Sequence, residues 1–134
     1  MIFVDSSAVV AILADEPEAD RFLDLLAGDG EKITGAHVRL ECSIVLARKL
    51  GLEVDAAEQL FDDFLIEAGI RVVAITDSIG RGAVLAYCRF GKGQGHRAQL
   101  NFGDCLSYAC ASEQGAQIVF KGDDFVHTDL KAPG

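Results

Sequence analysis

Four acidic side chains of this sequence occupy positions where a carboxylate is unusual unless it does chemistry. Asp5 and Asp123 each follow a short apolar run that is typical of a buried strand. Glu41 and Asp104 each lie among apolar residues of a segment with helical periodicity. Because a carboxylate on a buried helix face is costly unless it is paired or bound to a metal ion, these four acids are candidates for a functional site.

The chemistry open to these acids depends on how their charges are neutralised. If the carboxylates meet at about 5 Å, each ionised pair repels by roughly 3 kcal/mol at an effective dielectric constant of about 20. Bound protons would relieve this repulsion with raised pKa values, and a divalent cation would relieve it with its own charge. Oxygen ligands without histidine or thiolate favour Mg²⁺ or Mn²⁺. Such ions bind phosphates and generate hydroxide from bound water, so the pattern indicates phosphodiester hydrolysis.

Three of the acids also have a purely structural interpretation. Asp5 could cap the helix that follows its strand, and Asp104 could favour the dipole of a helix that Asn101 caps. Asp123, or Asp124 beside it, could serve in the turn that follows the last strand. Spacing alone leaves both interpretations open.

Glu41 is the acid that a cap explains least, because it lies in the middle of its predicted helix. It could pair with Arg48, which lies seven residues later on the same helix face, or it could point into solvent. Ser6 and Ser7 follow Asp5 and are typical helix caps rather than nucleophiles, because no histidine–acid pair is apparent beside them.

Short apolar runs alternate with amphipathic segments along the chain. Strands are predicted over residues 2–4, 32–34, 71–75 and 117–120. Helices are predicted over residues 8–14, 16–27, 37–50, 55–68, 77–90 and 102–114. Asp55 and Glu58 resemble a capping box at the start of the fourth helix. The alternation is typical of an α/β fold with a parallel sheet between helices, whose ligands bind at the carboxyl ends of the strands.

The composition is that of a folded, soluble domain. The chain has 134 residues, of which 50% are hydrophobic and 25% are charged, and this excludes a disordered chain. The length predicts a single domain over residues 1–134 with a core of its own. Apolar runs such as residues 8–14 are far shorter than a membrane span, and the first residues lack the basic start of a signal peptide. We therefore expect a cytoplasmic protein without membrane contact.

The net charge of −9 is unevenly distributed. Residues 1–70 hold 5 basic and 15 acidic residues, whereas residues 71–134 hold 7 basic and 6 acidic ones. Within residues 88–103, Arg89, Lys92 and Arg97 have no acid among them. This segment is the candidate for weak, salt-dependent binding of a polyanion, and an ordinary solvated loop is the alternative.

The four cysteines predict neither a disulfide framework nor a zinc site. Cys42, Cys88, Cys105 and Cys110 form no C-x-x-C pair, and the histidines are not clustered with them. Buried, reduced thiols are the expected state of all four.

Six strings spread over nearly the whole chain carry a family pattern, at residues 2–8, 39–42, 91–93, 100–109, 120–125 and 128–130. The most specific are Asn-Phe-Gly-Asp-Cys around Asp104 and Lys-Gly-Asp-Asp-Phe around Asp123. In this order they resemble the PIN-domain ribonucleases, specifically the VapC toxins of bacterial toxin–antitoxin pairs. The resemblance implies a PIN-like three-layer α/β/α sandwich around a short parallel sheet. It also implies an endoribonuclease that depends on Mg²⁺, with Mn²⁺ as a possible substitute.

The resemblance assigns roles to the acids. Asp5, Glu41 and Asp104 match the three central acids of the family by position. Asp123 matches the variable fourth acid, with Asp124 as the alternative. Asp5 and Asp104 would hold the metal ion most directly, and Glu41 and Asp123 would complete the pocket, partly through water, while an activated water attacks the phosphorus in line. The residues expected to support these acids are Ser6, Ser7, Asn101 and Asp124.

The resemblance also implies partners. It predicts an RNA substrate, a homodimer, and a VapB-type antitoxin whose C-terminal tail covers the acidic groove. The basic residues of 88–103, which are Arg89, Lys92 and Arg97, would bind the RNA. The apolar residues of the fourth helix, Phe61, Phe64 and Leu65, could serve the dimer or antitoxin surface or could pack in the core. Arg97 stands where the family often has proline, which bears on substrate preference because this loop flanks the groove.

Two other functions compete with a ribonuclease. A receiver-like phospho-acceptor module would use Asp5, Asp77 and Lys121 at the strand ends, but it leaves Glu41 and Asp104 unexplained. A catalytically inactive PIN-like binding protein would keep the fold without the chemistry, and the presence of all the acids argues against it.

Overall fold

Four short strands form the centre of the computed structural model, which describes residues 1–133. The strands are β1 (Ile2–Val4), β2 (Lys32–Gly35), β3 (Ile70–Val73) and β4 (Gln117–Val119). They pair in parallel in the order β3-β2-β1-β4, and Phe3 of β1 lies between Ile33 of β2 and Ile118 of β4. The parallel sheet predicted from the alternation of strands and helices is confirmed.

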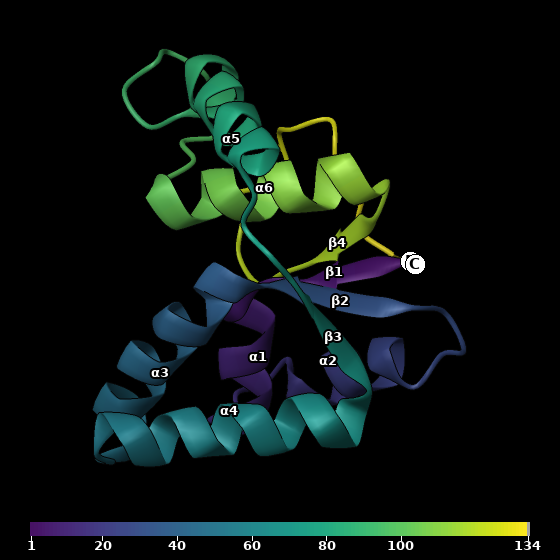
Figure 1. Ribbon diagram of the computed structural model, residues 1–134, viewed down its shortest axis with the longest axis vertical. Helices are drawn as coiled ribbons and strands as arrows, with labels where there is room; N and C mark the ends of the chain where they lie inside the picture. Colours follow the sequence, from purple (N-terminus) through teal and green to yellow (C-terminus); the bar gives the residue numbers. More distant parts are fainter. Residues whose placement is uncertain (134) are drawn as a thin grey trace.

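Six helices cover this sheet in the described part of the chain. They are α1 (Ser6–Leu13), α2 (Ala19–Leu26), α3 (Ala36–Leu50), α4 (Val54–Ala68), α5 (Asp77–Phe90) and α6 (Phe102–Gln114). Figure 1 shows α1 to α4 on one side of the sheet and α6 on the other, with α5 stacked outside α6. This is the predicted three-layer α/β/α sandwich.

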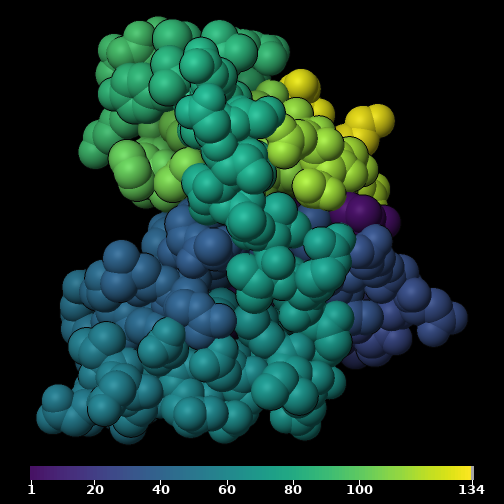
Figure 2. All heavy atoms as spheres, viewed as in Figure 1, coloured from purple at the N-terminus to yellow at the C-terminus, as the bar shows by residue number. Residues whose placement is uncertain are grey.

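In parallel α/β folds, ligands bind at the edge of the sheet where the strands end. α1 follows β1 and α3 follows β2 directly, so both helices begin at this edge. α6 runs back toward the start of β4, so its N-terminus also lies there, at the left of Figure 1. The space-filling view shows a notch at this edge, between α6 above and the lower helices (Figure 2). Three helix N-termini, whose dipoles favour anions, therefore surround the ends of the strands.

Glycines end the two longest helices, as their positions in the sequence predict. Gly51 after α3 has a φ of 66°, and Gly69 after α4 has a φ of 69°. This left-handed conformation is open to glycine without strain and closes the last helical turn.

The start of α2 was predicted too early. The helix begins at Ala19 rather than at residue 16. Glu16 precedes Pro17, and the residue before a proline is disfavoured in the helical region. β3 also ends at Val73, two residues before the end of the predicted strand.

The capping box predicted for α4 does not form. The helix is capped by Glu53, which makes no side-chain cap hydrogen bond. The Oδ1 of Asp55 accepts a hydrogen bond from the backbone N of Ala56 instead, at 2.9 Å. Glu58 therefore stays free to pair with Arg39 of α3, at 3.1 Å.

The buried apolar side chains form one continuous cluster that spans the sheet and both helical layers. Phe61, Phe64 and Leu65 belong to this core, so of the two roles that the sequence left open for them, core packing is confirmed. Three of the four free cysteines are buried as expected, but Cys88 is exposed on α5. No helix within residues 1–133 combines the length and the apolar character needed to cross a membrane.

Candidate active site

Asp5 stands at the carboxyl end of β1 and is almost completely buried, with 3% of its surface exposed. It caps α1, and its Oδ2 accepts hydrogen bonds from the backbone N of Ser7 at 3.1 Å and from the Ser7 hydroxyl at 2.7 Å. The same hydroxyl accepts a hydrogen bond from the backbone N of Lys121 at 2.9 Å, which fastens the end of β1 to the end of β4. The Oδ1 of Asp5 accepts no hydrogen bond from the described residues, so it is available to a ligand.

Asp104 is held in place by a reciprocal cap at the start of α6. The backbone N of Asp104 donates to Oδ1 of Asn101 at 2.9 Å, and the backbone N of Asn101 donates to Oδ2 of Asp104 at 3.1 Å. This capping box fixes the orientation of the Asp104 carboxyl group. The structural interpretation of Asp5 and Asp104 is therefore correct, but each cap uses only one of the two carboxylate oxygens.

Glu41 reaches the start of α6 from α3. A Cβ atom on Gly103 would lie 2.2 Å from Oε2 of Glu41, so the carboxylate is in direct contact with the α6 backbone. The Oε1 of Glu41 is buried and has no hydrogen-bond partner within residues 1–133. A buried oxygen without a partner is destabilising, and a cation beside it would supply the interaction.

His37 is the neighbour of Glu41 that the sequence analysis missed. It lies one helical turn before Glu41 on α3, and its Nε2 is 2.9 Å from Oγ of Ser107 and 3.8 Å from Oε1 of Glu41. Burial lowers the pKa of His37, although the charge of Asp5 acts in the opposite direction, so we expect a neutral imidazole at neutral pH. The four-residue spacing from Glu41 was the available signal.

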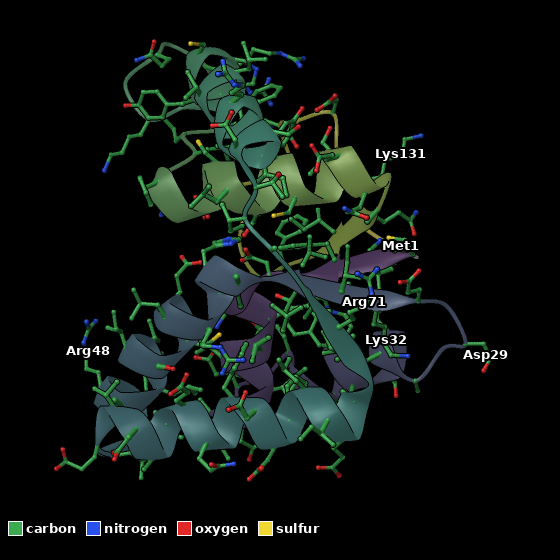
Figure 3. All side chains as sticks on the ribbon, viewed as in Figure 1. Met1, Asp29, Lys32, Arg48, Arg71 and Lys131 are labelled. Carbon is green, nitrogen blue, oxygen red and sulfur yellow. The ribbon has the colours of Figure 1, made fainter. Side chains whose placement is uncertain are left out.

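The pairing of Glu41 with Arg48, one of the two alternatives that the sequence left open, is not formed. Arg48 is exposed and points away from the molecule at the far end of α3 (Figure 3). The two residues are seven apart, which places them on one helix face but two turns from each other.

The carboxyl groups of Glu41 and Asp104 resist ionising together. Burial, followed by the charges of Asp5 and Asp104, raises the pKa of Glu41 to about 7. Burial also raises the pKa of Asp104 to about 7, with Asp5 and Asp124 adding repulsion, although the hydrogen bond from Asn101 lowers it. Acids that are distant in sequence therefore share one electrostatic site at the ends of the strands.

The structure brings Asp124, rather than Asp123, close to the other acids. Burial and the charge of Asp5 raise the pKa of Asp124, whereas a side-chain hydrogen bond with Asp104 lowers it. Asp123 and Asp124 are both exposed, but it is Asp124 whose side chain makes a hydrogen bond with Asp104. The geometry thus favours the alternative that the sequence left open for the fourth acid.

The donor set of this site fits a hard divalent cation. Its free groups are carboxylate oxygens, including the unpartnered Oε1 of Glu41, and its one imidazole is already bonded to Ser107. Within residues 1–133, no three histidine, cysteine, aspartate or glutamate side chains are close enough together to hold a metal ion unaided. Mg²⁺ is usually bound by one or two carboxylates with water completing the octahedron, so two of these acids would be enough to hold it.

The basic residues expected to contact RNA do not lie together. Arg89 lines a hollow with Tyr108 and Asp129 on the outer side of α6, and Lys92 lines a different hollow beside Phe102. Arg97 is 3.2 Å from Nδ1 of His127. The spacing of these cations in the sequence therefore does not produce one basic surface.

Two other lysines lie next to the acids instead. Lys49 and Lys121 line the hollow that also contains Glu41, Ser6 and Ser7. Neither lysine was assigned to a substrate from the sequence, and Lys121 was considered only as part of the receiver-like alternative.

The receiver-like alternative finds no support in the surroundings of its acceptor. Asp77 is the first residue of α5, its side chain is 87% exposed, and it pairs with Arg81 at 3.0 Å. Asp77 lacks the buried acidic neighbours that Asp5 has, so the candidate site remains the one around Asp5.

Comparison with known proteins agrees with this geometry. The family model described as PIN domain matches residues 2–131. Ribonuclease VapC28 of Mycobacterium tuberculosis is 41% identical over 130 residues, covering 97% of this chain and 96% of the relative. Ribonuclease VapC of Mycolicibacterium smegmatis is 40% identical over 129 residues, covering 96% and 97% of the two chains.

Two solved structures share the fold. The crystal structure of Mycobacterium tuberculosis VapC20, described as a toxin that cleaves the sarcin–ricin loop, has a TM-score of 0.78 and 22% identity, covering 97% of this chain and 96% of that one. A toxin–antitoxin complex from Klebsiella pneumoniae has a TM-score of 0.70 and 14% identity, covering 96% and 93% of the two chains. At these identities the likeness concerns the fold alone.

Proposed function

The chain belongs to the PIN domain family, and we propose that it is an endoribonuclease of the VapC type, the toxin of a toxin–antitoxin pair. The observation that carries this proposal is the meeting of Asp5, Glu41 and Asp104 at one sheet edge, where burial and the charge of Asp5 raise the pKa values of Glu41 and Asp104. The curated relatives at about 40% identity over nearly the full chain are ribonucleases by name, which supports the same activity.

Mg²⁺ is the proposed cofactor, with Mn²⁺ as a substitute. Asp5 and Asp104 would hold the ion with the carboxylate oxygens that their caps leave free. When bound, the ion would polarise a phosphodiester and lower the pKa of a bound water. Glu41 and Asp124 are proposed to orient water around the site through hydrogen bonds.

The chain's own residues make the site rigid before substrate arrives. Ser7 donates backbone and side-chain hydrogen bonds to the Asp5 carboxylate, and the backbone N of Asn101 donates one to the Asp104 carboxylate, so both carboxylates need no reorganisation. His37, bonded to Ser107, lies 3.8 Å from Oε1 of Glu41. Acids that are already held in position stabilise the transition state of hydrolysis without having to be ordered at the moment of reaction.

Cleavage of single-stranded RNA by the purified protein tests the proposal. We expect cleavage with Mg²⁺, none with EDTA, and a loss of at least about 100-fold in Asp5→Asn and Asp104→Asn. Asp77→Asn is the matched control, because that acid is exposed on α5, and its activity should equal that of the wild type.

Two results would contradict the proposed activity. One is cleavage that persists unchanged in Asp5→Asn, which would point to a contaminating nuclease or another site. The other is tight binding of an antitoxin without cleavage of any RNA, which would support the catalytically inactive PIN-like binding protein.

The proposed partners follow from the same family membership. A VapB-type antitoxin would cover the acidic groove in the cytoplasm, and two copies of the toxin would form a homodimer. Arg89, Lys92 and Arg97 stay predicted RNA contacts, each from a different part of the surface. Replacing them singly and measuring RNA affinity would show which of them the substrate reaches.

A further inference from the structure

A hollow with a volume of about 370 Å³ opens beside the acid site. Glu41 and the two serines after Asp5 line one side of it, and Lys49 and Lys121 line the other. Its walls come from α1, from the second half of α3 and from the segment after β4. A chain lying across the acids at the ends of the strands would therefore pass into this hollow.

Glu16 joins the two lysines inside the hollow. Its Oε2 is 3.1 Å from Nζ of Lys49, and its Oε1 is 3.1 Å from Nζ of Lys121. Lys121 also contacts Oε2 of Glu18 at 3.2 Å. The side chain of Glu16 is only 17% exposed, and the hydrogen bonds from the two lysines lower its pKa. One carboxylate thus bridges two ammonium groups, with one oxygen on each.

This arrangement resembles the way a phosphodiester would be bound. A phosphodiester carries one negative charge over two free oxygens, as a carboxylate does, and lysine binds either of them as a point charge. The chain carries a net charge of −9, which repels RNA in general. Two cations beside the acids are therefore what a polyanion needs in order to approach this site.

We propose that the Lys49–Lys121 hollow binds a phosphate of the RNA next to the one that is cleaved, and that Glu16 occupies the place of that phosphate until RNA displaces it. This inference rests on the proposed function, because it assigns part of the substrate path. Lys49 and Lys121 are then binding residues, and Glu16 is a competing anion that weakens RNA binding.

A purely structural role for these ion pairs makes different predictions. Half-exposed ion pairs contribute little to stability, so their loss would lower the unfolding temperature only slightly. In that case, replacing Glu16 or either lysine would leave RNA affinity unchanged. The proposal instead predicts opposite signs, with weaker binding when a lysine is removed and tighter binding when Glu16 is removed.

The experiment measures the affinity of a fluorescent single-stranded RNA for the protein at several salt concentrations. The Asp104→Asn variant with Mg²⁺ serves as the common background, since cleavage is blocked. We expect Lys49→Gln and Lys121→Gln each to weaken binding by about 3- to 10-fold and to reduce the salt slope by about 0.7. Glu16→Gln should strengthen binding by about 3- to 10-fold, and Glu18→Gln should strengthen it less.

A second ion pair provides the matched control. Arg71 pairs with Glu31 at the edge of the sheet where the strands begin, at the right of Figure 3. The acids lie at the opposite edge, where the strands end. Arg71→Gln and Glu31→Gln change the same charges, so they should alter RNA affinity by less than about 2-fold. Unfolding temperatures of all variants establish that each is folded.

The outcomes separate this inference from the proposed function. If Glu16→Gln fails to strengthen binding, or if the lysine variants bind RNA as the Arg71→Gln control does, the hollow is not part of the substrate path. If the wild-type protein cleaves RNA in that case, the proposed activity still stands. If binding follows the lysines and Glu16 but no Mg²⁺-dependent cleavage occurs, the hollow stands and the activity fails.

Discussion

Asp5 and Asp104 each serve the fold and the proposed chemistry with different atoms. In each residue, Oδ2 accepts the hydrogen bonds of a helix cap, and this fixes the carboxyl group against the backbone. The remaining oxygen is then held in a defined direction without further support. A cap at the end of a strand is therefore a way to orient a ligand oxygen before any cation arrives.

Gly103→Ala should separate activity from stability. The new Cβ would lie 2.2 Å from Oε2 of Glu41, and the flexible glutamate would move aside. We expect RNA cleavage to fall by about 100-fold, since small displacements of an oriented group are costly. The free energy of unfolding should stay equal or rise by up to about 1 kcal/mol, because alanine favours a helix over glycine.

The matched control for this substitution is Gly80→Ala in α5. A Cβ at that position meets nothing within 4 Å, so the variant should gain similar stability and keep full activity. Equal activity of the Gly103→Ala and Gly80→Ala proteins would show that the position of Glu41 does not matter for cleavage.

The stability of the protein in EDTA should fall as the pH rises from 5 to 8. The pKa values of Glu41 and Asp104 are about 7 in the folded chain, above their ordinary values of 4.5 and 3.8. Protonation therefore favours the folded state. That contribution is complete below the ordinary values and is lost as the pH rises through about 7.

Thermal unfolding of wild type and Glu41→Gln at each pH isolates this effect, because glutamine does not ionise. The variant should gain a few degrees relative to wild type at pH 8 and little at pH 5. Mg²⁺ should raise the wild-type unfolding temperature most at pH 8, where the acids are ionised. A difference between the two proteins that is constant over this range would contradict the prediction.

The sequence revealed the acids but not their neighbours. Asp5 and Asp104 could be assigned from a strand end and a helix cap, which are local signals. The contact of Glu41 with Gly103 joins residues 62 positions apart, and the contact of Lys121 with Glu16 joins residues 105 positions apart. Both contacts depend on how distant segments of the chain pack together. Arg48 was the partner considered for Glu41, and His37, which lies one turn before Glu41 on α3, was missed.

At the scale of elements, α6 has the greatest influence on the site. Its N-terminus contributes Asp104, contacts Glu41 through Gly103, and is positioned by the Asn101 capping box. The helix also packs against both central strands, β1 and β2. The direction of its first turn therefore decides where two of the acids lie.

Asn101→Ala should reduce both stability and activity. Loss of the side-chain cap is expected to lower the free energy of unfolding by about 1 kcal/mol. The backbone N of residue 101 can still donate to the Asp104 carboxyl group, but fraying of the first turn of α6 would loosen that contact, so cleavage should fall by about 10-fold. Thr76→Ala removes the corresponding cap of α5, where the Thr76 hydroxyl accepts from the backbone N of Ile79 at 3.2 Å. It should cost similar stability without loss of activity, as urea unfolding and RNA cleavage would show.

Helix ends were predictable wherever one residue determines them. Gly51, Gly69 and Asn101 end or begin helices where the sequence indicated, because their conformations or side chains act locally. The Asp55 capping box failed because its carboxylate bonds to the adjacent residue instead. The burial of each helix face was harder to predict. Val84 on α5 is 64% exposed because α5 packs mainly on α6.

At the scale of the molecule, an apolar surface on α5 and α6 remains uncovered. It consists of the exposed residues Val84, Tyr87 and Phe102 around a hollow of about 690 Å³, and we call it the α5–α6 face. Lys92 is the one charged residue among those that line this hollow in the described chain. Because the chain carries a charge of −9, two copies repel over most of their surfaces, and an apolar, nearly uncharged face is where they can meet.

The proposed homodimer should therefore use the α5–α6 face. Val84→Glu places a charge at its centre, and we expect this variant to be monomeric by size-exclusion chromatography with light scattering, whereas the wild type is dimeric. Ile66→Glu is the matched control, since Ile66 is 80% exposed on α4, away from this face, and it should stay dimeric. A Val84→Glu protein that remains dimeric would place the interface elsewhere. A monomeric wild type whose α5–α6 face becomes protected when antitoxin is added would assign the face to the antitoxin instead.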